Sequence, residues 1–131
     1  MNISQIHHVA VICSNYEISK RFYSEVLGLE IIAETFREAR RSHKLDLALP
    51  GGAQIELFSF PDSPARPSYP EACGLRHLAL ATPDLDACLR DLETSGIVAE
   101  PVRVDALTNR RFTFFADPDG LPIELYEVPR D

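Results

Sequence analysis

Residues 111–126 read RFTFFADPDGLPIELY, and this stretch predicts two antiparallel strands joined by a tight turn. The residues before Asp117 are largely β-branched or aromatic, the Pro-Asp-Gly sequence favours a turn, and apolar and polar residues alternate after it. Glu124 lies between Ile123 and Leu125, so its side chain points to the face opposite those two residues. A carboxylate in that position needs a partner, and the rest of the chain supplies candidates.

Residues 1–60 predict one strand, one helix and three further strands. The first strand covers residues 6–12, and its alternation places His8 on the face opposite the two valines. The helix begins after Ser14, whose spacing to Glu17 is that of a capping box, and it ends at a glycine. The three strands that follow cover residues 29–36, 43–49 and 53–60.

Residues 75–131 predict the same pattern a second time. The sequence LRHLAL at 75–80 matches IHHVAV at 6–11, and a helix begins at Pro83-Asp84 and again ends at a glycine. Three strands follow it, at residues 97–104, 111–116 and 121–128.

Residues 61–74 contain four prolines, which prevent a continuous helix or ladder and predict a stiff linker. The expected organisation is one domain over residues 1–131, with a first module at 1–60, the proline-rich linker at 61–74 and a second module at 75–131.

The repeat places chemically similar residues at equivalent positions. The interval from His8 to His77 and the interval from Glu56 to Glu124 are equal to within a single position. A module whose sheet cannot bury both faces alone is expected to pack against its copy. We therefore predict an α+β fold of two tandem βαβββ modules that form paired mixed β-sheets.

These four side chains predict a site for one divalent metal ion, although a lone histidine on a strand is usually a core or surface residue. Two imidazoles and two carboxylates make a nitrogen and oxygen donor set that suits Zn²⁺, Ni²⁺, Co²⁺, Mn²⁺ or Fe²⁺. With four protein ligands and no thiolate, an octahedral ion keeps two positions for water or a bidentate substrate. The expected ligands are His8, Glu56, His77 and Glu124.

Composition restricts the classes of partner. The chain has 131 residues and a net charge of −7, which argues against nucleic acid. Its three cysteines lie in unrelated contexts and are expected to be reduced, as in a cytoplasmic protein. No apolar run approaches the roughly 18 residues of a membrane span, and no secretory signal is evident. A basic cluster around residues 37–44 indicates either an anionic small molecule or a solvated surface.

The sequence resembles the vicinal oxygen chelate superfamily, which includes glyoxalase I, extradiol dioxygenases and the fosfomycin- and bleomycin-resistance proteins. The resemblance covers nearly the whole chain. It rests on HVAV at 8–11, FYxxVLG at 22–28, IEL at 55–57, HLA at 77–79 and FADPDG at 115–120 leading into IEL at 123–125.

The resemblance implies a metal-dependent, glyoxalase I-like lyase or isomerase that acts on a small α-oxygenated substrate. Glyoxalase I-like members carry ligands at the positions of the four residues above, and a ligand carboxylate, Glu124 or Glu56, would transfer the proton. Proteins similar to this one commonly form homodimers. Two alternatives are a drug- or metabolite-sequestering protein of the bleomycin-resistance type and metal-dependent addition to an epoxide of the fosfomycin-resistance type.

One position departs from the short bacterial glyoxalase I pattern. Ile12 stands four residues after the first ligand, where those enzymes usually carry an arginine for a glutathione carboxylate. Other cations could serve a different anionic substrate, and Arg111 is the best placed because it precedes a strand of the second module. The remaining candidates are Arg37, Arg40, Lys44 and Arg66.

Overall fold

The structure is a computed structural model that describes residues 1–130, and the chain divides into two compact units. The first unit is Met1–Ala65 and the second begins at Arg66, so the boundary lies inside the proline-rich segment 61–74. Each unit contains one four-stranded mixed sheet, which confirms the predicted α+β fold of two modules.

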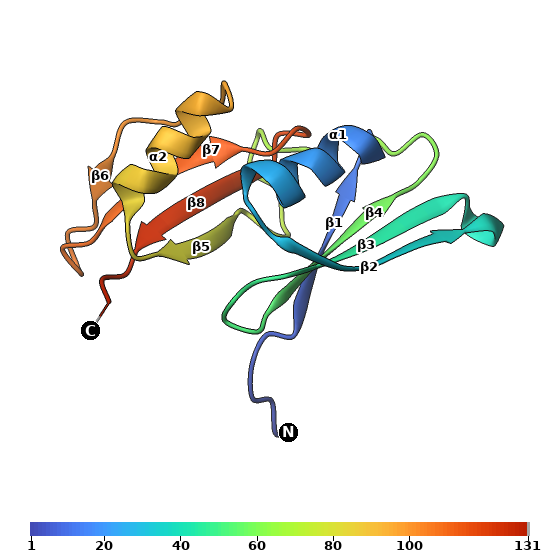
Figure 1. Cartoon of the computed structure of the whole chain (residues 1–131), viewed down its shortest axis with the longest axis horizontal. Coiled ribbons are helices and arrows are strands. Elements are labelled where there is room, and N and C mark those ends of the chain that lie inside the picture. Colours follow the sequence, from blue (N-terminus) through green and yellow to red (C-terminus); the bar gives the residue numbers. More distant parts are fainter. Residues whose placement is uncertain (131) are drawn as a thin grey trace. The chain divides into compact units, whose positions relative to one another are not determined.

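The sheet of the first unit has the strand order β1-β4-β3-β2. β1 runs parallel to β4, while β3 is antiparallel to both of its neighbours (Figure 1). The helical segment between β1 and β2 begins as α-helix and continues as one π-helical turn. The elements are β1 (His8–Cys13), α1 (Tyr16–Arg21), η1 (Phe22–Val26), β2 (Glu30–Arg37), η2 (Glu38–Arg40), β3 (Ser42–Ala48) and β4 (Gln54–Ser59).

The sheet of the second unit has the equivalent order, β5-β8-β7-β6. Its helix lies against β8 (Figure 1). The helix buries the side chains of Leu85 and Leu92. The same face of the sheet buries Ile123 and Leu125, as the predicted alternation requires. The elements are β5 (Leu78–Thr82), α2 (Leu85–Thr94), β6 (Arg103–Val104), β7 (Arg111–Ala116) and β8 (Pro122–Glu127).

The strand registers follow the sequence repeat residue by residue. Glu56 lies opposite Asp46 in the first unit, and Glu124 lies opposite Phe114 in the second. In the first unit Lys44 lies between Phe58 on one neighbouring strand and Thr35 on the other. In the second unit Phe112 lies in the same way between Tyr126 and Arg103. Residues opposite each other on neighbouring strands point to the same face, so the repeat defines one open face in each unit.

The turn before β8 forms as the sequence predicts. Asp117 is almost fully buried, and its Oδ1 accepts hydrogen bonds from the backbone N–H groups of Asp119 and Leu121, each at 2.9 Å. Gly120 has φ of +83°, which a side chain at that position would disfavour. This turn fixes the register of β7 against β8 and therefore the position of Glu124.

Two local predictions were wrong. The first helix is capped by Asn15 instead of Ser14, because the Asn15 side chain is the one that accepts from the N–H of Ile18, at 3.1 Å. The strand predicted at 97–104 is reduced to Arg103–Val104, because Pro101 has no N–H to donate to a ladder. None of the helices within residues 1–130 has the length and apolar character needed to cross a bilayer.

Candidate functional site

The first unit brings His8 and Glu56 together on its open face. His8 begins β1 and Glu56 lies in the middle of the parallel neighbour β4, between the buried residues Ile55 and Leu57. The alternation of β4 buries those two apolar side chains and turns Glu56 to the other face. Nε2 of His8 lies 2.9 Å from Oε2 of Glu56.

The second unit repeats this pair with His77 and Glu124. His77 immediately precedes β5, and Glu124 lies in the middle of the parallel neighbour β8. Nε2 of His77 lies 3.1 Å from Oε2 of Glu124. Each unit therefore presents one imidazole nitrogen and one carboxylate oxygen as a closely spaced donor pair.

The geometry of each pair fits two neighbouring ligands of one metal ion. Adjacent donors around an octahedral ion with bonds of about 2.1 Å lie about 3 Å apart. The same spacing suits a hydrogen bond from imidazole to carboxylate, which holds each pair in position. Within residues 1–130 no group of three or more His, Cys, Asp or Glu side chains is placed to hold a metal ion, and each unit by itself holds one histidine–glutamate pair.

The carboxylate of Glu56 has a second partner. Nζ of Lys44 lies 3.3 Å from Oε1 of Glu56 and 3.3 Å from Oδ1 of Asp46. Hydrogen bonds to Asp46, the larger effect, and to Glu56 raise the pKa of Lys44, so the ammonium stays charged. His8 and Lys44 together engage both carboxylate oxygens of Glu56.

The carboxylate of Glu124 has apolar neighbours instead. The positions of Asp46 and Lys44 are taken in this unit by Phe114 and Phe112. The Phe114 ring meets the His77 ring edge to face, with centroids 5.1 Å apart. Among the described residues, His77 is the one ion-pair partner of Glu124.

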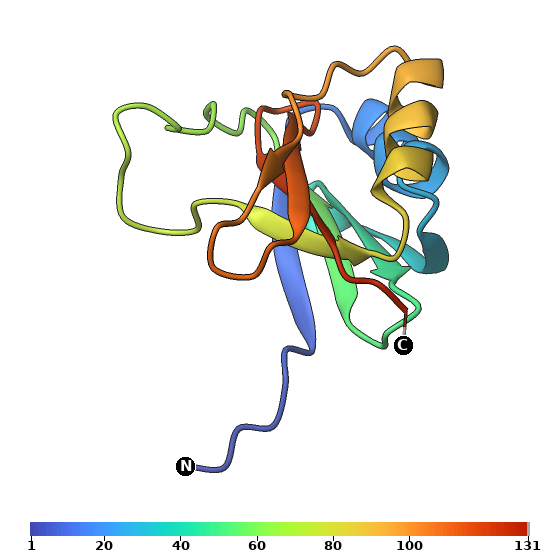
Figure 2. The same cartoon turned by 90° about the vertical axis from the view of Figure 1, so that its left-hand side faces the viewer.

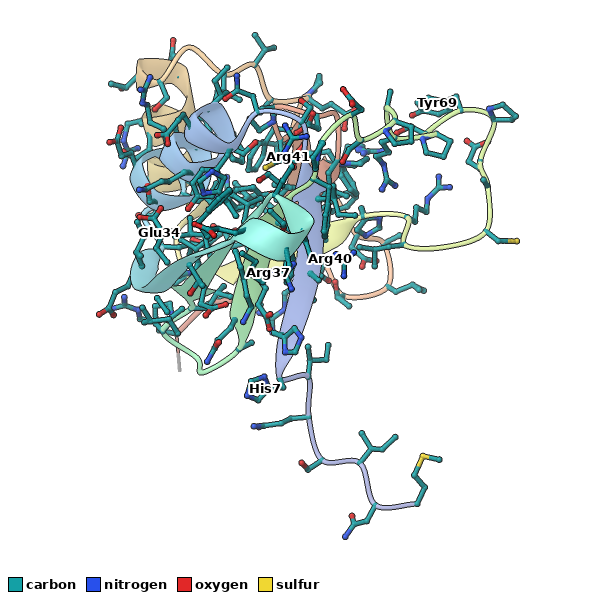
Figure 3. The ribbon with its side chains drawn as sticks, turned by 90° about the vertical axis from the view of Figure 1, so that its right-hand side faces the viewer. His7, Glu34, Arg37, Arg40, Arg41 and Tyr69 are labelled. Atoms are coloured by element: carbon teal, nitrogen blue, oxygen red, sulfur yellow. The ribbon has the colours of Figure 1, made fainter. Side chains whose placement is uncertain are left out.

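The predicted substrate-binding arginines of the first unit lie at one end of its sheet. The guanidinium of Arg37 lies 5.1 Å from the ring centroid of Phe58 and donates to Oγ of Ser42 at 3.2 Å. Arg40 lies 5.1 Å from the ring of Phe60. Figure 3 shows both arginines beside the turn that joins β2 to β3.

Arg111 is held by two carboxylates. Its Nε lies 2.8 Å from Oε2 of Glu127, and its Nη1 lies 3.2 Å from Oδ1 of Asp86 on α2. Hydrogen bonds to Glu127, the larger effect, and to Asp86 raise the pKa of the Arg111 guanidinium. Hydrogen bonds from Arg111 and from the N–H of Leu85 lower the pKa of Glu127 to about 2. The structure thus places Arg111 in a link between β7, β8 and α2.

A cavity of about 870 Å³ lies within the second unit. Its walls are the loop that precedes β5 and the sheet face that carries His77 and Phe114. Figure 2 shows this loop on one side of the sheet and α2 on the other. Arg66 fastens the loop, because its Nη2 donates to the carbonyl oxygens of Leu75 at 2.8 Å and Arg76 at 3.0 Å.

Arg103 also lines this cavity and is not among the candidates predicted from the sequence. Its guanidinium lies 5.0 Å from the ring centroid of Phe112 and 5.5 Å from that of Phe114. The repeat supplied a usable signal, because Arg103 follows Thr35 at the same interval at which Glu124 follows Glu56. The strand registers agree with this equivalence. Thr35 lies opposite Lys44 of β3, and Arg103 lies opposite Phe112 of the equivalent strand β7.

Comparisons with known proteins agree on one family. The model of the Glyoxalase/Bleomycin resistance protein/Dioxygenase superfamily matches residues 5–125. YwkD of Bacillus subtilis (strain 168) is 58% identical, and the match covers 97% of this chain and 99% of YwkD. The crystal structure of a glyoxalase family protein from Enterococcus faecalis is 49% identical, with a TM-score of 0.89 and coverage of 97% of this chain and 100% of that one.

Two more distant relatives have names that state an activity or a ligand. A 2-epi-5-epi-valiolone epimerase from Actinomyces sp is 26% identical over 95% of this chain and 79% of its own length. TnmS3, an antibiotic binding protein from Streptomyces sp. CB03234, is 30% identical, with a TM-score of 0.72 and coverage of 99% of both chains.

Proposed function

Because the chain belongs to the Glyoxalase/Bleomycin resistance protein/Dioxygenase superfamily, we propose that it is a metal-dependent lyase or isomerase acting on small α-oxygenated molecules. The observation that carries this proposal is the histidine–glutamate pair that occurs once in each unit, at 2.9 Å and 3.1 Å. His8, Glu56, His77 and Glu124 would hold the ion, and their mixed donors suit Zn²⁺, Ni²⁺, Co²⁺, Mn²⁺ or Fe²⁺.

A divalent ion bound there would polarise two vicinal substrate oxygens and make the adjacent C–H more acidic. The chain must then supply a group that takes the proton from carbon and returns it. Both glutamates are candidates, and their surroundings differ.

Glu124 is the stronger candidate for the proton-transferring group. Lys44 and His8 together hold both oxygens of Glu56, which favours a fixed carboxylate. Glu124 lies opposite Phe114, whereas Glu56 lies opposite Asp46. No ammonium group within residues 1–130 binds the second carboxylate oxygen of Glu124. We therefore assign to Glu56 the role of a fixed ligand and to Glu124, the other carboxylate ligand, the transfer of the proton. The similarity to an epimerase supports this chemistry, because inversion at a carbon beside a carbonyl proceeds by removal and return of a proton.

Hydrogen exchange next to a carbonyl tests this proposal. Metal-loaded protein is incubated in D₂O with a panel of α-hydroxyketones and α-hydroxyaldehydes, and loss of the α-proton signal is followed by ¹H NMR. We expect exchange that requires the metal and that falls at least about a hundredfold per bound ion in Glu124→Gln. Glu93→Gln, on the exposed side of α2, is the matched control. Exchange no faster than in protein-free buffer, or unchanged in Glu124→Gln, would contradict the proposal.

The second candidate function is sequestration of a small molecule without turnover. The similarity to TnmS3 and the cavity of about 870 Å³ favour it. A sequestering protein would bind members of the same panel tightly and leave their α-protons unexchanged.

A further inference from the structure

The cavity of the second unit is locally positive in an acidic protein. The chain has a net charge of −7, yet the cavity is lined by three arginines and two glutamates. A local excess of positive charge on an acidic chain favours an anionic occupant. The charged residues that line it are Arg66, Glu71, Arg76, Glu100 and Arg103.

Arg103 is the arginine in this cavity that combines largely free N–H donors with a fixed position. Its single ion pair within the described residues is with Glu100 at a long 3.6 Å, and 55% of its side chain is exposed. Arg66 already binds Ser68 and two carbonyl groups, and Arg76 is exposed, with no ring or carboxylate among the described residues to fix its side chain. The contacts of Arg103 with Phe112 and Phe114 hold the guanidinium in place by cation–π attraction without occupying its N–H donors.

Phe114 connects Arg103 to the metal-ligand pair. The Phe114 ring contacts the His77 imidazole on one side and the Arg103 guanidinium on another, at 5.1 Å and 5.5 Å. The imidazole and the guanidinium are therefore no further apart than the sum of these two distances. A small organic anion spans such a gap, with its body against the phenyl ring.

We propose that Arg103 recognises a carboxylate or phosphate group of the substrate in this cavity, while the substrate's vicinal oxygens lie beside His77. The position of the vicinal oxygens rests on the proposed function, whereas the contact of Arg103 with an oxyanion does not. The substrate class is then a small α-hydroxycarbonyl compound with a negative charge a few bonds from the chelating oxygens.

Three α-hydroxyketones that differ in charge serve as probes. Dihydroxyacetone is neutral, hydroxypyruvate replaces one hydroxymethyl group with a carboxylate, and dihydroxyacetone phosphate carries a phosphate. Isothermal titration calorimetry of zinc-loaded protein is expected to show at least about tenfold tighter binding of one or both anions than of dihydroxyacetone. The preferred anion identifies which oxyanion the cavity takes.

Arg103→Gln is expected to remove this preference, with a loss of about ten- to a hundredfold in affinity for the anion and little change for dihydroxyacetone. Arg103→Lys should keep part of the preference because it keeps the charge without the planar donors. Arg90→Gln, an exposed arginine on α2 outside the cavity, should bind like the parent protein. Thermal unfolding of each variant checks that the fold is retained.

Two results would overturn the assignment: a parent protein that does not prefer either anion, or an Arg103→Gln variant that keeps the preference. Zinc content is measured separately in every variant. If the parent takes up neither zinc nor any of Ni²⁺, Co²⁺, Mn²⁺ and Fe²⁺, the proposed function fails, and the same titrations without metal still decide the role of Arg103, because a guanidinium–oxyanion contact needs no metal.

Discussion

Phe114 lies directly opposite Glu124 on neighbouring strands, at the register position where Asp46 lies opposite Glu56 in the other unit. The repeat thus keeps the histidine–glutamate pair and changes what surrounds it. One pair is bordered by an ammonium and a second carboxylate, and the other by two phenyl rings. The two units are therefore expected to respond differently to mutation.

Lys44 gives the first prediction, since its ammonium would compete with the proposed metal ion for Glu56. Lys44→Gln removes a positive charge beside the proposed ligand pair, and we expect zinc to bind about two- to fivefold more tightly, the range of a partly exposed ion pair. Competition with a chromogenic chelator measures the change. Lys20→Gln, which breaks the separate ion pair with Glu34, is the control. Weaker zinc binding in Lys44→Gln would mean that Lys44 positions Glu56 for the ion.

The ion pair of Arg111 and Glu127 gives a prediction about pH. The pKa of Glu127 is lowered to about 2 in the folded protein, from an ordinary value of 4.5. A carboxyl group with a lowered pKa adds stability that is complete above pH 4.5 and is lost as the pH falls toward 2. Glu127→Gln lacks this contribution, so its melting temperature should fall less between pH 4.5 and 2 than that of the parent.

Melting curves at half-unit pH intervals test this, with Glu93→Gln as the exposed control on α2. Identical pH profiles for the parent and Glu127→Gln would show that this pair does not couple folding to pH.

The succession of helices and strands along the chain and the face occupied by each glutamate could be predicted from sequence because alternation and turn chemistry are local. Ile123, Glu124 and Leu125 alternate between the two faces, and the Asp117 turn sets their register. The cap at Asn15 was missed because Ser14 and Asn15 are both good caps, and backbone geometry selects between them. Arg103 was missed because its contacts with Phe112 and Phe114 form only when the short strand Arg103–Val104 pairs with β7.

Oligomerisation is a further prediction. β2 is an edge strand of its sheet, and it exposes the large apolar side chains of Ile31, Ile32 and Phe36. Edge strands with apolar side chains favour association with a second copy. Analytical ultracentrifugation at micromolar concentration should therefore give twice the mass of a single chain. Ile32→Lys should shift the protein toward monomer, and Ile18→Lys on α1 should not. A monomeric parent protein would exclude the dimer.

Substrate choice gives the next prediction. Ile12 lies on the same face as His8, opposite Phe58, and is 56% exposed, so an apolar side chain occupies the position where an arginine would bind glutathione. Loss of one charge-assisted contact costs about 1.5–3 kcal/mol, or roughly ten- to a hundredfold in affinity. We expect weak or no turnover of the methylglyoxal–glutathione hemithioacetal, and a gain in Ile12→Arg.

The assay uses metal in excess and follows thioester formation by absorbance. A kcat/KM in the parent within the range of about 10⁴–10⁸ M⁻¹s⁻¹ found for physiological substrates would contradict this expectation and make the hemithioacetal the substrate.

The metal content of purified variants tests the central claim most directly. Native mass spectrometry and elemental analysis of the parent protein should give about one divalent ion per chain, as four ligands of one site require. Glu56→Gln and His77→Ala each remove a ligand from a different unit, so each should lose most of the bound metal while Glu93→Gln keeps it. If both ligand variants hold as much metal as the parent, the two histidine–glutamate pairs are structural and the proposed metal-dependent chemistry is wrong.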